Sequence, residues 1–285
     1  MNFTESSRRL SRAIKKIVAI SISSSIVVAT AGNGKNFSVY ASIPYSHYTS
    51  GGTRINAKIP ESFLSQLGLK KILLIYENRI FAKGATNIDL SLLNETAVQA
   101  RGHPNILVSL DVESWNRWSE RSVEKYLFLV KSFKRENHVS SVGLYGVIPQ
   151  TVFGIGRGFK NIYKGLNNRY MNLAELVDFF SPSLYNYSGN DFNAWEAIAR
   201  FEISEARRLG NKPIIPYVTP EVWETGRTRF LSYEEMRERL ELLKELGVDG
   251  CVVWGGSKGI AANATFDPSS GWAKAVVEFS AGQDQ

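Results

Sequence analysis

The chain has 285 residues, of which 44% are hydrophobic, 12% aromatic and 21% charged, and this composition suits a globular protein with a sizeable core. The formal net charge is +7. Much of it lies in the first thirty residues, where Arg8, Arg9, Arg12, Lys15 and Lys16 face only Glu5. The remainder is mildly basic and gives no indication of a nucleic-acid partner. The single cysteine, Cys251, excludes an intrachain disulfide and a thiolate metal cluster.

The N-terminal segment has the pattern of a signal peptide over residues 1–31. A basic region ends at Lys16, residues 17–31 are apolar and small, and Ala29-Thr30-Ala31 is a cleavage signal of the A-x-A type. The alternatives are an amphipathic helix or a membrane anchor, but the apolar part is short for a span of roughly 20 residues. The apolar residues expected after a twin-arginine pair are missing, which favours a general secretory signal. We therefore expect a secreted or periplasmic protein with no stable membrane insertion after cleavage.

From residue 32 on, short apolar runs alternate with helical patterns. The runs are residues 37–44, 70–81, 105–112, 142–149, 179–187, 212–220 and 249–257. Helical periodicity covers residues 122–137, 192–210, 231–247 and 271–280. Gly210 is a C-cap for the second of these helices, and Ser232 with Glu235 forms a capping box at the start of the third.

This alternation predicts a parallel sheet covered by helices. Seven runs over residues 32–285 favour a single catalytic domain, an α/β fold of the distorted TIM-like (β/α) barrel type with about seven parallel strands. An open, doubly wound sheet is the alternative.

The ends of these runs carry aromatic and acidic residues. In chain order they are Tyr40, Glu77, Asp111, Glu113, Tyr145, Tyr185 with Asn186, Tyr217 and Trp254. Barrel enzymes bind substrates at this carboxyl-terminal rim. Aromatic faces stack on sugar rings and carboxylates transfer protons at glycosidic bonds, so the rim indicates a carbohydrate ligand.

Asp111 and Glu113 are two residues apart, so on a strand both side chains point to one side and Val112 to the other. Two close carboxylates resist double ionisation, which raises one pKa into the range of a general acid. Their spacing is too short for an inverting pair and suits substrate-assisted hydrolysis. In that reaction Glu113 protonates the leaving oxygen and Asp111 orients the 2-acetamido group that attacks the anomeric carbon. The alternative is that both residues cap a helix or pair with surface arginines.

The segment DVESW, residues 111–115, resembles the D-x-E-x-W catalytic motif of the hyaluronidases, glycoside hydrolase family 56. Further segments are similar to the same family: FSVYASIP, ILLIYENRIF, VGLYG, SPSLYNY and LGVDGCVVWGGS. The resemblance spans residues 32–285 and implies a barrel of seven strands. The family cysteines are absent, and Gly256 stands where the family has a second serine, which leaves the exact substrate open.

The resemblance implies an endo-acting hydrolase of an amino-sugar polysaccharide such as hyaluronan or chondroitin, without a cofactor or metal. It implies Glu113 as acid and base, Asp111 and Tyr185 as partners of the acetamido group, and Trp254 as the floor under the cleaved sugar. Tyr145, Tyr217 and Tyr40 are further candidate substrate-binding residues. The alternatives are a non-catalytic glycan-binding protein and a hydrolase of a bacterial exopolysaccharide or a chitin-like polymer.

Three weaker patterns carry no assigned function. Residues 255–259 match a G-x-S-x-G elbow, but no histidine follows them in the chain. The glycine-rich residues 154–158 lack the spacing and the lysine of a nucleotide loop and are expected to form a mobile loop above the rim. Trp223, Arg227 and Arg229 are equally compatible with a glycan groove and with packing against a helix.

Overall fold

The computed structural model describes residues 37–224, 226–256 and 263–282, which belong to one compact unit, Lys35–Gln285. The expected signal peptide, residues 1–31, lies outside the described residues, and so does Ser257 of the elbow pattern. Within the described part of the chain, no helix is long and apolar enough to cross a membrane.

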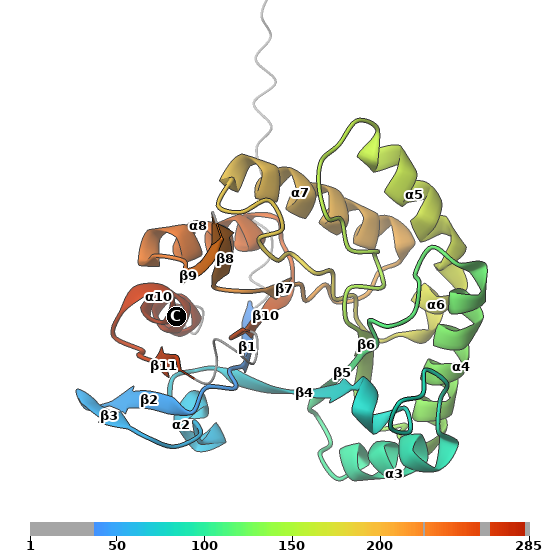
Figure 1. Cartoon of the computed structure of the whole chain (residues 1–285), viewed down its shortest axis with the longest axis horizontal. Helices are drawn as coiled ribbons and strands as arrows, with labels where there is room; N and C mark the ends of the chain where they lie inside the picture. Colours follow the sequence, from blue (N-terminus) through green and yellow to red (C-terminus); the bar gives the residue numbers. More distant parts are fainter. Residues whose placement is uncertain (1–36, 225, 257–262, 283–285) are drawn as a thin grey trace, which may run out of the picture. The chain divides into compact units, whose positions relative to one another are not determined.

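The centre of the fold is a parallel sheet with the strand order β6-β5-β4-β1-β10-β7 in the described residues (Figure 1). The strands are β1 (Ser38–Ser42), β4 (Lys70–Tyr76), β5 (Leu107–Asp111), β6 (Ser141–Leu144), β7 (Tyr217–Val218) and β10 (Gly250–Trp254). Each lies within one of the predicted apolar runs, except that β6 begins one residue before the run 142–149. The predicted α/β class with a distorted TIM-like barrel is confirmed.

Residues 180–183 occupy the seventh position and close the ring between β6 and β7. Parallel bridges join Tyr145 to Ser181 on one side and Ser183 to Tyr217 on the other. The backbone N–H of Tyr217 donates to the carbonyl of Pro182 at 2.8 Å, and the N–H of Leu184 donates to the carbonyl of Tyr217 at 2.8 Å. Proline accepts hydrogen bonds but has no N–H to donate, so the ladders on this side of the barrel are short.

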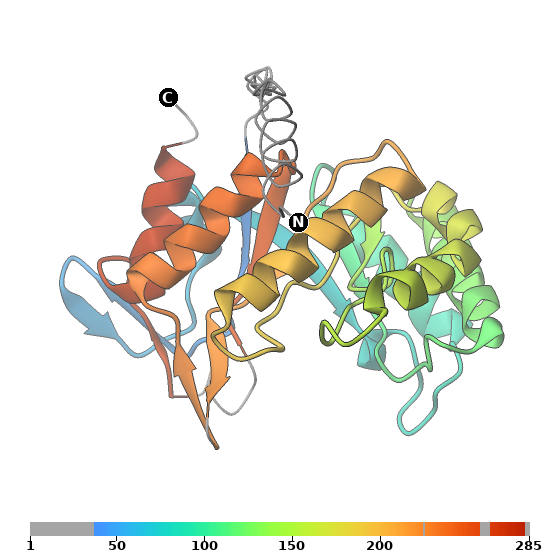
Figure 2. The ribbon, with the colours of Figure 1, turned by 90° about the horizontal axis from the view of Figure 1, so that it is seen from above.

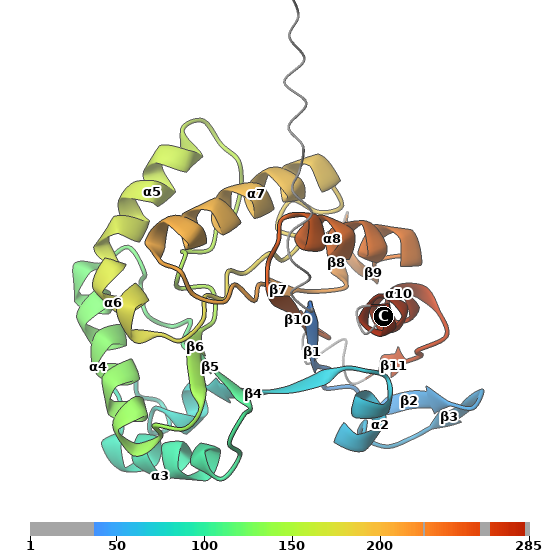
Figure 3. The ribbon, with the colours of Figure 1, turned by 180° about the vertical axis from the view of Figure 1, so that it is seen from behind.

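Helices cover the outside of the strands (Figures 1 and 3). They are α2 (Glu61–Gln66), α3 (Leu90–Arg101), α4 (Glu120–Glu136), α5 (Phe159–Arg169), α6 (Met171–Leu176), α7 (Phe192–Leu209), α8 (Tyr233–Glu245) and α10 (Gly271–Ala281). The four predicted helices correspond to α4, α7, α8 and α10. Gly210 is the C-cap of α7, and the capping box of Ser232 and Glu235 is present at α8.

The barrel has two separate cores because side chains alternate along each strand. On β5, Val108 and Leu110 face the helices and belong to the outer core, whereas Leu107 faces inward. The inner core is small and aromatic, and Gly143 on β6 makes room for it. A Cβ atom at Gly143 would lie 2.5 Å from the ring of Phe179.

Two smaller sheets complete the described fold. One has the order β11-β2-β3, from β2 (His47–Ser50), β3 (Thr53–Ile55) and β11 (Thr265–Phe266). The other is a hairpin of β8 (Glu221–Glu224) and β9 (Arg227–Phe230), which follows β7 and projects from the body of the molecule (Figure 2).

Candidate active site

Asp111 and Glu113 line one pocket at the carboxyl-terminal rim. The pocket has a volume of about 530 Å³, and its other lining residues are Tyr76, Glu77 and Asn78. Asp111 is the last residue of β5 and is mostly buried, whereas Glu113 is exposed. Val112, between them, is buried in the outer core, and its carbonyl accepts a 2.8 Å hydrogen bond from the hydroxyl of Tyr126. The two carboxylates therefore face the same space, as the i, i+2 spacing predicts.

Burial and neighbouring charges act most strongly on Asp111. Burial, followed by the Glu113 carboxylate, raises the pKa of Asp111 to about 7, while Arg117 opposes the rise and Glu77 adds to it. One carboxylate oxygen of Asp111 is buried without a hydrogen-bond partner. Near neutral pH Asp111 is therefore partly protonated and holds a proton that it could pass to a neighbouring group.

The carboxylate of Glu77 and the ring of Trp115 hold the segment that carries Glu113. Glu77 lies in a short 3₁₀ helix, η2 (Glu77–Arg79), and accepts a 2.6 Å hydrogen bond from the backbone N–H of Ser114. Trp115 is buried with its ring centroid 5.4 Å from that of Phe81, and its indole N–H donates to the carbonyl of Thr86 at 2.8 Å. The tryptophan of the DVESW segment thus anchors the loop and does not line the pocket.

Arg117 joins this loop to the loop that follows β6. Its guanidinium donates to the carbonyl of Gly146 at 2.7 Å and to the hydroxyl of Thr151 at 3.1 Å. Its own carbonyl accepts a 2.6 Å hydrogen bond from the Tyr170 hydroxyl. Gly146 has a φ of 57°, and a Cβ atom there would lie 2.5 Å from the Thr151 hydroxyl oxygen, so glycine is required at this junction.

The five candidate aromatic residues all belong to the inner core: Tyr40, Tyr145, Tyr185, Tyr217 and Trp254. The rings of Tyr185 and Trp254 are stacked at 5.4 Å between centroids and 21° between planes. Tyr145 lies 5.7 Å from Tyr185 and 4.9 Å from Tyr217. Tyr185 and Trp254 are only partly buried, so this pair presents an aromatic surface at the rim.

Below the pocket, three polar atoms are buried without a hydrogen-bond partner: the hydroxyl oxygens of Ser109 and Tyr217 and one oxygen of Asp111. They are close to one another, since burial raises the pKa of Tyr217 and the side chains of Ser109 and Asp111 both alter it. Buried polar groups with spare hydrogen-bonding capacity are uncommon and are concentrated at binding sites. Asp249 at the opposite rim differs, because its carboxylate accepts a 2.9 Å hydrogen bond from the N–H of Ile214.

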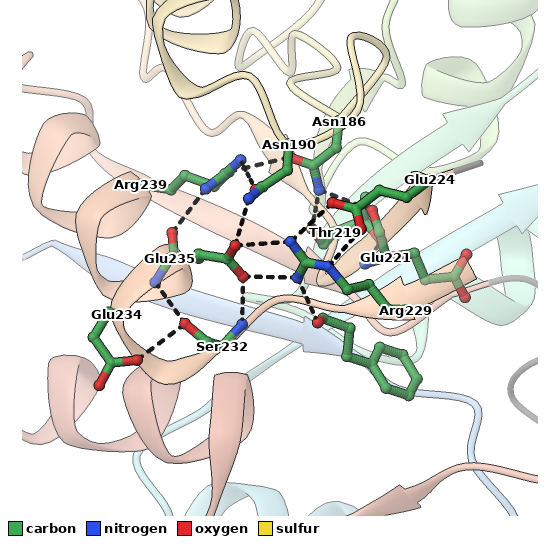
Figure 4. Close-up of polar contacts among 11 residues, drawn as sticks. Asn186, Asn190, Thr219, Glu221, Glu224, Arg229, Ser232, Glu234, Glu235 and Arg239 are labelled. Atoms are coloured by element: carbon green, nitrogen blue, oxygen red, sulfur yellow. Dashed lines mark hydrogen bonds and ion pairs between the residues drawn. The ribbon is translucent and has the colours of Figure 1, made fainter. Parts of the chain in front are cut away.

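A polar network holds the segment after Tyr185 (Figure 4). The Asn186 side-chain amide donates to the carbonyls of Thr219 at 3.0 Å and Glu221 at 2.8 Å, and its oxygen accepts from Arg239 at 3.1 Å. Arg229 bridges Glu224 and Glu235 and is therefore engaged within the protein. Trp223 on the same hairpin is 58% exposed and Arg227 is exposed, so neither packs against a helix as a buried side chain.

Gly256 stands beside the carboxylate of Glu221. It has a φ of 126°, and a Cβ atom would collide with that carboxylate. The glycine at this position, where the hyaluronidase pattern has serine, thus lets the β8–β9 hairpin approach the end of β10.

The sequence analysis proposes Asp111, Glu113 and the five aromatic residues as site residues and does not include Tyr76 or Arg117. Tyr76 ends β4 and lines the pocket, and its position directly before Glu77 was the available signal. The glycine-rich residues 154–158 connect Val152 to α5, with open space around Gly154, Gly156 and Gly158. Within the described residues, no cluster of three or more histidine, cysteine or acidic residues is arranged to hold a metal ion.

No protein-family profile matches the chain, and no curated protein matches it in sequence. Among solved structures, the fold is similar to bee venom hyaluronidase, with a TM-score of 0.58, 17% identity and coverage of 87% of this chain and 97% of that chain. Bee venom hyaluronidase in complex with a hyaluronic acid tetramer gives a TM-score of 0.56 and 16% identity over 79% of this chain and 92% of that chain.

The spore cortex-lytic enzyme SleL of Bacillus megaterium is also similar, with a TM-score of 0.50 and 10% identity over 88% of this chain and 75% of that chain. These likenesses show that the chain has the barrel fold found in glycosidases. At such low identity they establish the fold alone.

Proposed function

We propose that the chain is an endo-glycosidase that hydrolyses N-acetylhexosaminidic bonds of a polysaccharide with retention of configuration. The observation that carries this proposal is the pair of Asp111 and Glu113 in one rim pocket, with one pKa raised to about 7. The aromatic surface of Tyr185 and Trp254 adds a platform for a sugar ring. Similarity in fold to bee venom hyaluronidase supports a glycan substrate.

In the proposed reaction, the proton of Asp111 passes to Glu113 when the glycan binds, which leaves Asp111 ionised. Glu113 is then the general acid, because it is the exposed member of the pair and can reach the glycosidic oxygen. It gives its proton to the glycosidic oxygen as the bond from that oxygen to the anomeric carbon breaks. The acetamido oxygen of the same sugar attacks the anomeric carbon and forms a cyclic oxazolinium ion. Asp111 accepts a hydrogen bond from the acetamido N–H and stabilises the positive charge.

Hydrolysis of the cyclic ion completes the cycle. Glu113, now ionised, takes a proton from a water molecule that attacks the anomeric carbon, and the acetamido group is released. Two displacements at one carbon retain its configuration.

A turnover screen of the full chain tests this function. Hyaluronan, chondroitin and chitin oligomers are incubated with the wild type and with Glu113→Gln, and the anomer formed first is followed by NMR. We expect the wild type to release a product of retained configuration from at least one polymer. Glu113→Gln should lose turnover by about 10³-fold. Its circular dichroism spectrum should be the same as that of the wild type. An inverted product, or equal turnover by the variant, would contradict the proposal.

The proposed site of action follows from the N-terminal pattern. We propose that the N-terminal segment directs export of the chain, so that the enzyme degrades its polymer outside the cytoplasm. Cell fractionation with an antibody against the chain tests this location, and detection in the cytoplasmic fraction alone would refute it.

A further inference from the structure

Two fully buried charged side chains take no part in the proposed chemistry. Glu202 on α7 is 0% exposed and Arg239 on α8 is 1% exposed. Burial of an ionisable group destabilises the folded state unless hydrogen bonds compensate for it. We therefore expect each of these two groups to hold a particular part of the structure in place. Both of them hold segments that carry aromatic residues.

Glu202 fixes the backbone in front of Phe153. One carboxyl oxygen of Glu202 accepts a 2.7 Å hydrogen bond from the N–H of Val152, and the other is buried without a partner. Burial holds the pKa of Glu202 well above its ordinary value. The N–H of Phe153 itself donates to the hydroxyl of Tyr163 at 3.4 Å. The main chain is thus held at two successive residues, while the ring of Phe153 stays 60% exposed.

Arg239 fixes the segment between Tyr185 and Tyr187. Its guanidinium lies 5.6 Å and 5.3 Å from the ring centroids of Phe192 and Trp195, which are stacked on each other, and donates to the side-chain oxygen of Asn186. Asn186 in turn holds two backbone carbonyls near the β8–β9 hairpin (Figure 4). Since Asn186 lies between the two tyrosines in the chain, this network limits the movement of both rings.

The rings held in this way form a continuous row. From Trp254, the row passes to Tyr185 at 5.4 Å, to Tyr187 at 6.0 Å, and to Phe153 at 5.0 Å between centroids. The Tyr187 hydroxyl is 2.8 Å from that of Ser183, which is 3.0 Å from that of Tyr145. The row therefore begins at Trp254, which packs against the inner core and interacts with Tyr76 of the pocket lining, and it ends at the exposed phenyl ring of Phe153.

We propose that Phe153 and Tyr187 form an outer subsite that binds a further pyranose ring of the glycan whose bond is cleaved at Asp111 and Glu113. This inference rests on the proposed function. A rigidly held, exposed aromatic ring offers a flat apolar surface to the C–H face of a sugar at little entropic cost. Glu202 and Asn186 act as positioning residues for this subsite, since their contacts reach the backbone and not the pocket.

Affinity as a function of oligosaccharide length tests the subsite. Chitin and hyaluronan oligosaccharides of increasing length are titrated calorimetrically into the full chain carrying Glu113→Gln, which binds without turnover. The same titration is made with Phe153→Ala and with Phe153→Trp added to that background. Phe128→Ala is the matched control, because Phe128 is 49% exposed on α4 and does not line the pocket of Asp111 and Glu113.

We expect affinity to rise with length until the outer subsite is filled. Phe153→Ala should lose about tenfold in affinity for the long oligosaccharides and nothing for the shortest one that binds. Phe153→Trp should restore the affinity for the long oligosaccharides, and Phe128→Ala should leave it unchanged. Loss in Phe153→Ala with rescue by Phe153→Trp is a result that a merely destabilised loop would not give.

Equal affinities of Phe153→Ala and its parent for every length would overturn the inference, as would failure of all oligosaccharides to bind. If the length-dependent binding is lost in Phe153→Ala while the wild type turns over no polymer, the subsite stands and the proposed hydrolase function fails. If turnover occurs but its KM for long substrates is the same in Phe153→Ala and the wild type, the function stands and the subsite fails.

Discussion

Asp111 and Glu113 differ in their surroundings although they line the same pocket. Asp111 has a buried carboxylate oxygen without a hydrogen-bond partner, whereas Glu113 reaches solvent. The pKa of Asp111, about 7, is set by burial first and then by three charged neighbours with opposing effects. A proton shared by this pair is the property on which the proposed chemistry depends, and it can be measured at the level of single residues.

The pH dependence of turnover should therefore report this proton. The proposed acid needs the protonated pair, so kcat/KM should fall as the pH rises through about 7. Arg117→Gln removes a cation that lowers the pKa of Asp111, and the alkaline limb should move to higher pH. Glu77→Gln removes an anion that raises this pKa, and the limb should move to lower pH. A pH–rate series on the three proteins checks the signs, and shifts in the reverse directions would contradict this electrostatic account.

Asp111→Asn should stabilise the protein while it lowers turnover. The folded state holds the proton of Asp111 more tightly than the unfolded chain does, because the pKa rises from 3.8 to about 7 on folding. The stability linked to this proton is present at low pH and is lost as the pH rises through about 7. The neutral asparagine avoids that loss.

We expect a gain on the order of 1–2 kcal/mol in the free energy of unfolding at about pH 8 and a smaller gain at about pH 5. Urea unfolding of both proteins at the two pH values measures it. An equal effect at both pH values would show that the proton of Asp111 is not responsible.

At the scale of elements, the β8–β9 hairpin is held to α8 and to the segment after Tyr185 by the network of Figure 4. Arg239 and Arg229 contribute to it differently. Arg239 is buried and donates to the Glu235 carbonyl and the Asn186 side chain, whereas the side chain of Arg229 is 30% exposed and pairs with two carboxylates. Burial lowers the pKa of Arg239 to about 10, and hydrogen bonds from Arg229 lower that of Glu235 to about 2.

Arg239→Met should consequently destabilise the fold more than Arg229→Met. The first variant leaves the partly buried Asn186 side-chain oxygen without its donor and removes one donor from the Glu235 carbonyl, at a cost of about 3 kcal/mol. The second breaks partly exposed ion pairs, at a cost of about 1 kcal/mol. Urea unfolding of the two variants gives the comparison, and equal costs would mean that the buried hydrogen bonds of Arg239 contribute little.

Several elements follow from local patterns in the chain. The strand β5 and the helices α4, α7, α8 and α10 were predictable because their periodicity reflects burial on one face. Around Pro182, Pro213 and Pro216 the expected strands shrink to bridges and the two-residue β7, because proline cannot donate to a ladder. The β8–β9 hairpin was not predicted. Its residues are mostly polar, and it is stabilised by contacts with residues that are distant in the sequence.

At the scale of the whole molecule, closure of the barrel depends on the small inner core. Gly143 permits Phe179 to cross the face of β6, and a methyl group at Gly143 would overlap that ring. Seven segments enclose a narrow interior, so the side chains inside have little freedom to rearrange.

Gly143→Ala should accordingly destabilise the fold by about 1–3 kcal/mol, the usual cost of overpacking. Phe179→Leu on the Gly143→Ala background should recover part of this loss because the smaller side chain vacates the space. Thermal and urea unfolding of the single and double variants tests the coupling. Additive losses in the double variant would show that the two positions do not compete for one volume.

The amino-acid sequence by itself determined the chain order of the barrel strands and of α4, α7, α8 and α10, the strand end at which Asp111 and Glu113 lie, and the side of the strand they share. These features depend on periodicity over a few neighbouring residues, which local physical chemistry dictates. Only the tertiary structure decided that Arg117 and Glu77 oppose each other at Asp111, that Glu202 holds Val152 across 50 residues, and that four rings form a row from Trp254 to Phe153. Such contacts arise when the barrel closes and brings distant segments together, and no local pattern encodes which side chains then meet.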